Sequence, residues 1–121
     1  MGIADARRAG LAFPALGLGC GALTGEYGPV DRTGIGTTVR RALDLDVRMI
    51  DLAGAYRGGD LERTVGKAIR GSRALIATRG GLRFDDTGYP VGVDGSPAAL
   101  ARACDASLRR LAVDTIDLYY L

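Results

Sequence analysis

A chain of 121 residues and 12.6 kDa has room for one domain, and its 47% of apolar and 25% of charged residues predict a folded, soluble protein. Its apolar runs are much shorter than the roughly 18 residues that cross a membrane, and its N-terminus lacks the apolar stretch of a signal peptide, so we expect a cytoplasmic protein. The net charge of +2 comes from basic residues in scattered pairs rather than one stripe, which argues against nucleic acid as a partner.

Short apolar runs alternate with amphipathic stretches along the chain, a pattern typical of βα units and a parallel sheet. Ile35 and Val39 recur at helical spacing and predict a first helix over residues 33–45. A strand is expected directly after it, over residues 47–51.

The same spacing predicts a second helix. Leu61 and Val65 lie on its apolar face, and we expect it to begin at Asp60 as the N-cap. Gly71 supplies a left-handed residue that stops it, and a strand over residues 74–78 follows.

Ser96 and the proline after it are typical of the start of a third helix, which we expect to end near Arg109 and Arg110, where cations suit the helix dipole. A last strand is expected over residues 115–121. No helix follows this last strand in the sequence, so its face and one edge of the sheet would be uncovered. Parallel sheets are usually covered, and we therefore expect residues 1–121 to form a single incomplete domain.

Two segments, residues 17–29 and 80–95, are rich in glycine and are expected to be loops. A loop as long as the second is either functional or a mobile surface segment, and both interpretations stay open. Residues 17–22 match the Gly-x-Gly-x-x-Gly/Ala dinucleotide fingerprint, but that fingerprint needs a helix that begins within it. The glycines and proline that follow break any helical pattern, so we expect a turn there that allows a ligand to approach the backbone closely.

The sequence contains no histidine, which excludes Ser-His-Asp and Cys-His catalysis and imidazole metal ligands. Cys20 and Cys104 lie too far apart for a Cys-x-x-Cys site, so we expect buried free thiols, no disulfide and no metal site. An acid or base would therefore be an Asp, Glu, Tyr or Cys side chain, or the single lysine, Lys67.

Three polar side chains fall where parallel strands end. Asp51 closes the predicted strand over residues 47–51, Tyr56 follows it in the next loop, and Arg79 comes at the end of the predicted strand over residues 74–78. The carboxyl ends of parallel strands share one edge, where the active sites of α/β folds lie. A tyrosine beside a cation can act as a general acid, because the positive charge favours the phenolate, and an aspartate can hold the cation. The same spacing also fits an Asp–Arg ion pair with a purely structural role.

Five stretches resemble the aldo-keto reductase family in order and spacing. They are residues 49–56 (Met-Ile-Asp-Leu-Ala-Gly-Ala-Tyr), Glu62 with residues 65–68 (Val-Gly-Lys-Ala), residues 77–79 (Ala-Thr-Arg), residues 106–111 (Ala-Ser-Leu-Arg-Arg-Leu) and residues 114–121 (Asp-Thr-Ile-Asp-Leu-Tyr-Tyr-Leu). Residues 16–20, Leu-Gly-Leu-Gly-Cys, resemble the opening strand of the family. The resemblance covers residues 11–121, and several motifs in register are more specific than any one of them.

This resemblance implies an α/β fold, a (β/α)8 TIM barrel, of which the chain supplies an opening segment, three βα units and a fourth strand. It also implies NADPH as the cofactor and the reduction of a small carbonyl substrate. Tyr56 matches the proton donor of the family, Asp51 matches the aspartate that orients a catalytic lysine, and Arg79 stands where that lysine is expected. Contacts with the cofactor are expected at the glycine-rich turn and a strand end: Gly19, Cys20, Gly21 and Asp51.

The sequence also departs from the family pattern. Arginine keeps the charge of lysine but is a planar fork rather than a compact ammonium, so Arg79 is not a conservative replacement. The family's histidine is expected directly after the position of Leu121, beyond this sequence, as is half of the barrel. Four further positions depart from the usual residues: Asp46 and Arg57 replace glycines, Leu52 replaces a threonine and Leu61 replaces a small polar residue.

Two functional hypotheses follow. The first is the N-terminal half of an NADPH-dependent reductase, inactive as this chain alone and completed by the rest of the barrel in the same or a second chain. The alternative is a degenerate or stand-alone, non-catalytic half-barrel that covers its exposed strand by self-association or with a partner chain. Arg79 favours the alternative, whereas Asp51 and Tyr56 favour the first.

Overall fold

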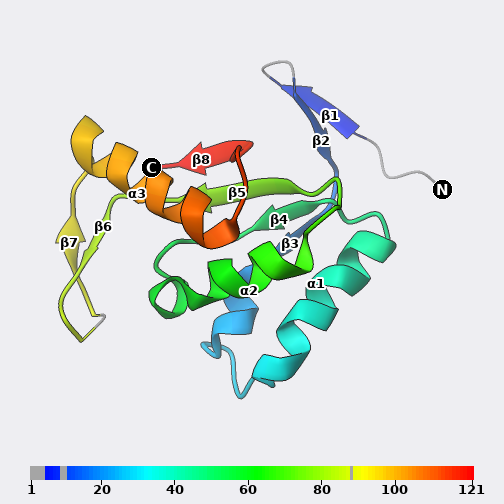
Figure 1. Ribbon diagram of the computed structural model, residues 1–121, viewed down its shortest axis with the longest axis horizontal. Coiled ribbons are helices and arrows are strands. Elements are labelled where there is room, and N and C mark those ends of the chain that lie inside the picture. Colours follow the sequence, from blue (N-terminus) through cyan, green and yellow to red (C-terminus); the bar gives the residue numbers. More distant parts are fainter. Residues whose placement is uncertain (1–4, 9–10, 88) are drawn as a thin grey trace.

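The computed structural model describes residues 5–8, 11–87 and 89–121, and a four-stranded parallel sheet lies at its centre (Figure 1). The strand order follows the chain, β3-β4-β5-β8, so each strand pairs with the strand of the next βα unit. Leu18 lies opposite Ile50, and Ile50 lies opposite Ile76. The strands are Gly17–Gly19 (β3), Met49–Asp51 (β4), Leu75–Arg79 (β5) and Leu118–Tyr120 (β8).

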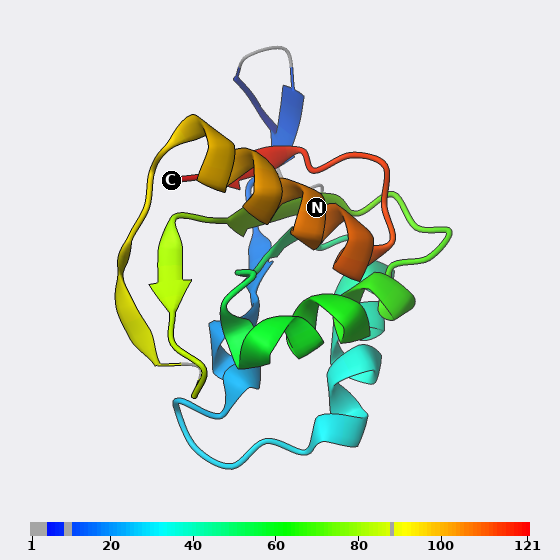
Figure 2. The same ribbon diagram turned by 60° about the vertical axis from the view of Figure 1, so that its left-hand side comes forward.

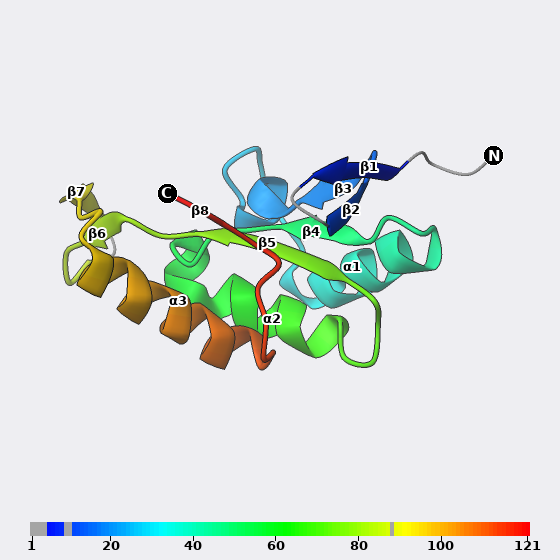
Figure 3. The same ribbon diagram turned by 90° about the horizontal axis from the view of Figure 1, so that it is seen from above.

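Three α-helices connect the parallel strands and lie together on one side of the sheet (Figure 3). They are Ile35–Asp44 (α1), Asp60–Ala68 (α2) and Pro97–Leu111 (α3). Helix α2 packs between the other two, against α1 and against α3. The alternation of βα units predicted from the sequence is therefore confirmed. No helix among these residues is both long and apolar enough to cross a membrane.

The hydrophobic core lies between the helices and the sheet. The strands contribute Ile50 and Ile76, which are almost fully buried. The helices bury the apolar faces predicted from their spacing, and the core cluster includes Ile35, Val39, Leu61, Val65, Ala68, Ile69 and Leu111. Burial of these faces is what holds α1 and α2, each of ten residues or fewer, in helical form.

The helix ends agree with the sequence prediction for α3 and differ for α2. The hydroxyl of Ser96 accepts a hydrogen bond from the backbone N–H of Ala99 at 3.3 Å, as an N-cap does. Helix α2, in contrast, has Gly59 as its N-cap, in a left-handed conformation with φ +88°. Asp60 is therefore the first residue of the helix, not its cap, and its carboxylate accepts from Arg63 at 3.4 Å. Gly71 is left-handed as expected, with φ +73°.

Two β-hairpins flank the sheet. Asp5–Arg8 (β1) pairs antiparallel with Leu11–Pro14 (β2), and Leu82–Phe84 (β6) pairs antiparallel with Pro90–Val93 (β7). The second hairpin stands apart from the parallel sheet (Figure 2). It lies within residues 80–95, so the expectation of an irregular loop there is wrong. Both of its strands are exposed and only three and four residues long, which is too short for the period-two pattern of a strand to stand out.

The turn after β3 also differs from its prediction. Residues Cys20–Thr24 form a short 3-10 helix that ends at Gly25, whose φ is +97°. The expectation that no helix begins there is wrong for this one turn. It holds for the α-helix that a dinucleotide-binding fingerprint needs, because the glycines of the segment stop the helix after five residues.

Candidate functional site

Asp51 and Arg79 form an ion pair at the carboxyl ends of neighbouring strands. Asp51 is the last residue of β4 and Arg79 the last of β5. The Nη2 atom of Arg79 donates to both carboxylate oxygens of Asp51, at 2.6 and 2.8 Å. The two side chains are 41% and 35% exposed, so the pair contributes little to the free energy of unfolding. Its effect is to fix a positive charge at this edge of the sheet.

The surroundings keep Arg79 charged. The hydrogen bond that Arg79 donates to the Asp51 carboxylate raises the pKa of Arg79 above its usual value, and the charge of Asp51 adds to the effect. The guanidinium carbon lies 5.3 Å from the centre of the Tyr120 ring, within range of a cation–π contact. The buried Nε atom has no acceptor in the described part of the chain. Within the described residues, the hydrogen bonds of the guanidinium therefore run from Nη2 to the carboxylate of Asp51.

Tyr56 begins a short 3-10 segment, Tyr56–Gly59, between β4 and α2. Its ring packs against the hydrophobic core, and its hydroxyl lies over Gly21, where an added Cβ would be 3.5 Å from the oxygen. The phenolic group is also close enough to Arg79 to contribute to the raised pKa of that residue. The structure thus gathers Asp51, Tyr56 and Arg79 at one edge of the sheet; their catalytic roles stay predictions.

The glycine-rich turn lies beside these residues. An added Cβ on Gly19 would have no atom within 4 Å, so a ligand can approach the backbone there. The Cys20 side chain is fully buried, and burial, with the charge of Asp51, raises the pKa of its thiol to about 12. Cys20 can therefore offer a cofactor its backbone only. Cys20 and Cys104 are both free, and the described residues contain no cluster of metal-ligating side chains.

A cavity of about 840 Å³ opens at this edge of the sheet. The Asp51–Arg79 pair lies on one side of it, and the exposed β6–β7 hairpin forms another wall. The cavity thus places an ion pair against an apolar surface, as ligand sites do. The lining residues are Asp51, Arg79, Gly80, Gly81, Leu82, Val93, Gly95, Tyr120 and Leu121.

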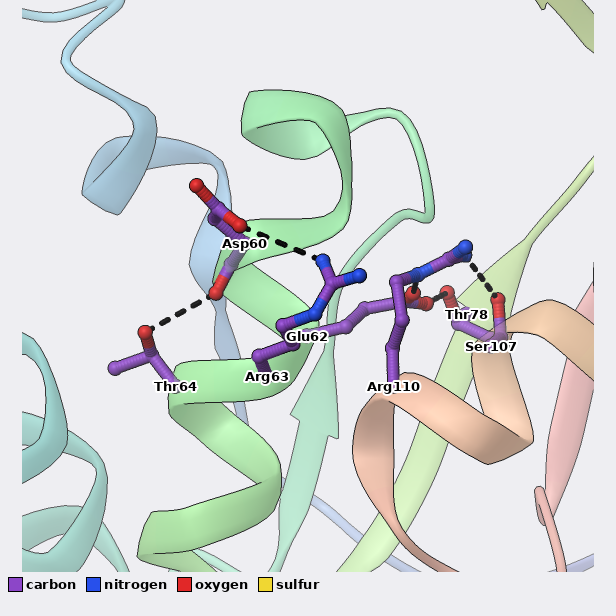
Figure 4. Close-up of polar contacts among 7 residues, drawn as sticks. All are labelled: Asp60, Glu62, Arg63, Thr64, Thr78, Ser107 and Arg110. Atoms are coloured by element: carbon purple, nitrogen blue, oxygen red, sulfur yellow. Dashed lines mark hydrogen bonds and ion pairs between the residues drawn. The ribbon is translucent and has the colours of Figure 1, made fainter.

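A second polar cluster lies behind the site, and sequence reasoning missed it. Glu62 of α2 is fully buried, and its Oε2 accepts from Nε of Arg110 at 2.5 Å (Figure 4). Its Oε1 accepts from the Thr78 hydroxyl at 3.0 Å, and Nη2 of Arg110 donates to the Ser107 hydroxyl at 3.1 Å. The signal was present: Glu62 falls on the apolar face of α2, three residues before Val65, where a carboxylate needs a buried partner.

Comparison with known families identifies the family of the chain. A family model described as "Aldo/keto reductase family" matches residues 15–121. The chain belongs to the aldo/keto reductase family. A probable aldo-keto reductase 1 from Glycine max is 33% identical over 116 residues, and the aldo-keto reductase yakc [NADP(+)] from Schizosaccharomyces pombe is 30% identical over 112 residues. These matches cover 92% and 89% of this chain and 33% of each relative.

A solved aldo/keto reductase has the same fold. The holo form of aldo-keto reductase AKR11C1 from Bacillus halodurans superimposes with a TM-score of 0.83 and 32% identity, over 97% of this chain and 39% of that one. The four parallel strands and their helices are therefore part of a (β/α)8 barrel, as the sequence predicted. The chain spans about a third of the length of the curated relatives it matches.

Proposed function

We propose that this chain is the N-terminal part of an NADPH-dependent aldo/keto reductase, with Tyr56 as the proton donor to a carbonyl oxygen. The observation that carries the proposal is the Asp51–Arg79 ion pair at adjacent strand ends, beside Tyr56. Family membership supports the reaction class, and one curated relative is named for NADP(+). The cytoplasmic location expected from the sequence belongs to the same proposal.

The chemistry of the three side chains fits this role. Proton transfer to a developing alkoxide is easiest from a group whose own anion is stabilised. A guanidinium brought to the Tyr56 hydroxyl would stabilise the oxygen as its proton leaves, and Asp51 keeps the Arg79 guanidinium in place at this edge of the sheet. Since Arg79 is a planar fork held by one nitrogen, it aims its charge less directly than the ammonium that the family pattern has there.

Part of a nicotinamide site fits the residues present. NADPH, when bound, would supply the hydride that reduces the carbonyl carbon. Gly19 leaves its backbone open to a ligand, Gly21 lies against the Tyr56 hydroxyl, and Asp51 lines the cavity of about 840 Å³. Cys20 would contribute backbone alone. We expect the other contacts with the cofactor to come from regions of the family barrel that this chain does not match, and we therefore expect no reduction by the 121 residues alone.

The test is a fusion of this chain to the C-terminal part of a family member, assayed for aldehyde-dependent oxidation of NADPH. Tyr56→Phe is expected to lower the rate about a hundredfold or more, because general acid catalysis is lost. Arg79→Lys is expected to raise the rate, because a compact ammonium can approach the phenol more closely.

Tyr27→Phe is the matched control, since Tyr27 is 82% exposed and outside the site; it should leave the rate unchanged. If Tyr56→Phe keeps full activity, Tyr56 is not the proton donor. If Arg79→Lys brings no gain, the proposed role of Arg79 is wrong.

A second candidate is the non-catalytic half-barrel that associates with a second copy or with a partner chain. The observation that favours it is the apolar surface around the cavity, where four side chains are 40% to 82% exposed. Exposed apolar patches of this kind mark interaction surfaces. The four residues are Leu82, Val93, Tyr120 and Leu121.

A further inference from the structure

The buried network around Glu62 connects three elements that frame the candidate site. Glu62 belongs to α2, Thr78 to β5, and Ser107 and Arg110 to α3 (Figure 4). A buried carboxylate is costly unless it is paired and hydrogen-bonded, and both oxygens of Glu62 have partners. The carboxylate therefore holds the Arg110 guanidinium in one orientation.

That orientation presses Arg110 against the backbone that carries Tyr56. A Cβ added at Gly59 would lie 2.6 Å from Nε of Arg110, and one added at Gly54 would lie 2.9 Å from its Nη2. Both are closer than real Cβ contacts allow, so the guanidinium occupies the space that a side chain at either glycine would fill. Gly54 and Gly59 bracket Tyr56, and the guanidinium backs both ends of the segment.

The backbone between these glycines needs such support. Arg57, Gly58 and Gly59 have φ values of +55°, +62° and +88°, so three consecutive residues are left-handed. A non-glycine residue in this conformation is strained and persists only where its surroundings hold it. The contact with Arg110 is one such constraint. Arg110 and Arg79 also line one cavity of about 190 Å³.

We propose that Arg110, oriented by the buried carboxylate of Glu62, is a positioning residue that fixes the backbone of residues 54–59 and so the place of Tyr56. Arg110 acts through this backbone and does not itself reach a reacting atom. The inference rests on the proposed function only in that Tyr56 is the group whose placement matters.

Two substitutions in the 121-residue chain separate positioning from simple stabilisation. Arg110→Met leaves Glu62 without its charged partner, so it should lower the melting temperature and speed amide hydrogen exchange in residues 56–59. Arg110→Lys restores a charge for Glu62 but not the planar fork, so it should recover most of the melting temperature. Exchange in residues 56–59 should stay at least tenfold faster than in the wild type, and the ring signals of Tyr56 should shift in NMR spectra.

Arg109→Lys is the matched control, because Arg109 is the neighbouring arginine of α3 and is exposed; exchange should not change. Glu62→Gln, which keeps the size of the side chain, should speed exchange in the same segment by a smaller factor.

The proposal is overturned if Arg110→Lys returns both the melting temperature and the exchange in residues 56–59 to wild-type values. It is also overturned if Arg110→Met and Glu62→Gln speed exchange in β4 and β5 as much as in the segment, since the network would then only stabilise the fold. None of these readouts depends on catalysis. An active Tyr56→Phe fusion would thus refute the proton donor and leave the positioning result standing.

Discussion

Two residues adopt left-handed backbone conformations where the family resemblance implies glycine. Asp46, before β4, has a φ of +61°, and Arg57, after Tyr56, has a φ of +55°. A side chain in this region costs about 1–2 kcal/mol relative to the right-handed conformation. The backbone at both positions therefore has the shape that glycine suits, although neither residue is glycine.

Cys20 offers a test of the burial of the glycine-rich turn. Its thiol is fully buried and its pKa is raised from 9.0 to about 12, first by burial and then by the charge of Asp51. At pH 8.5 we expect iodoacetamide to label Cys104, which is half-buried, and to leave Cys20 unlabelled in the folded protein; both should react in guanidinium chloride. Rapid labelling of Cys20 under native conditions, located by mass spectrometry, would show that the turn opens.

The same shift makes stability depend on pH. Above pH 9 the Cys20 thiol of the unfolded chain loses its proton, whereas the folded chain keeps it until about pH 12, so rising pH favours unfolding. Over this range the free energy of unfolding should fall by up to about 1.4 kcal/mol per pH unit more in the wild type than in Cys20→Ala. Urea titrations at several pH values measure the difference. Equal slopes in the two proteins would contradict the raised pKa.

At the scale of elements, α2 lies very close to the end of α3 at Gly66. A Cβ added at Gly66 would overlap the backbone carbonyl oxygen of Leu111, which a small shift of a side chain cannot relieve. Gly36 in α1 is different, because a Cβ there would meet only Arg40 and Ala68 at ordinary distances of 3.8 and 4.0 Å. Two helical glycines therefore have opposite environments.

We expect Gly66→Ala to lower the free energy of unfolding by about 1–3 kcal/mol, because α3 must move away from α2. Gly36→Ala, the matched control, should raise it by about 0.5–1 kcal/mol through helix propensity. Urea unfolding followed by circular dichroism measures both. Equal free energies of unfolding for Gly66→Ala and Gly36→Ala would contradict the close packing of α2 on α3.

The sequence predicted best the elements that bury an apolar face. Val39 and Val65 mark helices α1 and α2, and both are fully buried. The β6–β7 hairpin was missed because its strands are only three and four residues long, its second strand contains Gly92, and the register shifts between Arg83 and Phe84. The N-cap of α2 was misplaced by one residue because Gly59, rather than the acidic side chain of Asp60, caps it.

Part of the candidate site could also be predicted from the sequence, and part could not. The meeting of Asp51 and Arg79 followed from parallel strand order, which aligns strand ends whatever the helices do. The pairing of Glu62 with Arg110 did not follow from periodicity, since 48 positions separate them and only the packing of α2 on α3 brings them together. The sequence predicted that Arg110 interacts favourably with the dipole at the end of α3. In the structure it forms an ion pair with the buried carboxylate of Glu62.

At the scale of the whole molecule, the outer strands of the four-stranded sheet, β3 and β8, have free pairing edges within the described residues. Exposed apolar side chains, among them Tyr120 and Leu121, lie at the β8 end. An open edge beside such residues favours association.

We therefore expect the purified 121-residue chain to sediment as a dimer or a larger species at micromolar concentration. We also expect it to leave the fluorescence of micromolar NADPH unchanged. Analytical ultracentrifugation and a fluorescence titration test the two expectations. A stable monomer would contradict the self-associating half-barrel, and a saturable change in NADPH fluorescence would favour the reductase.

The parallel strand order gives such association a direction. The β3 edge and the β8 edge are different surfaces. Two β8 edges can pair antiparallel about a two-fold axis and close a dimer, whereas a β8 edge that pairs in parallel with the β3 edge of another copy leaves one of each free. This head-to-tail addition ends only if the rotation between copies closes a ring; otherwise it continues as a filament. Whatever caps the β8 edge therefore decides between a closed particle and an open polymer.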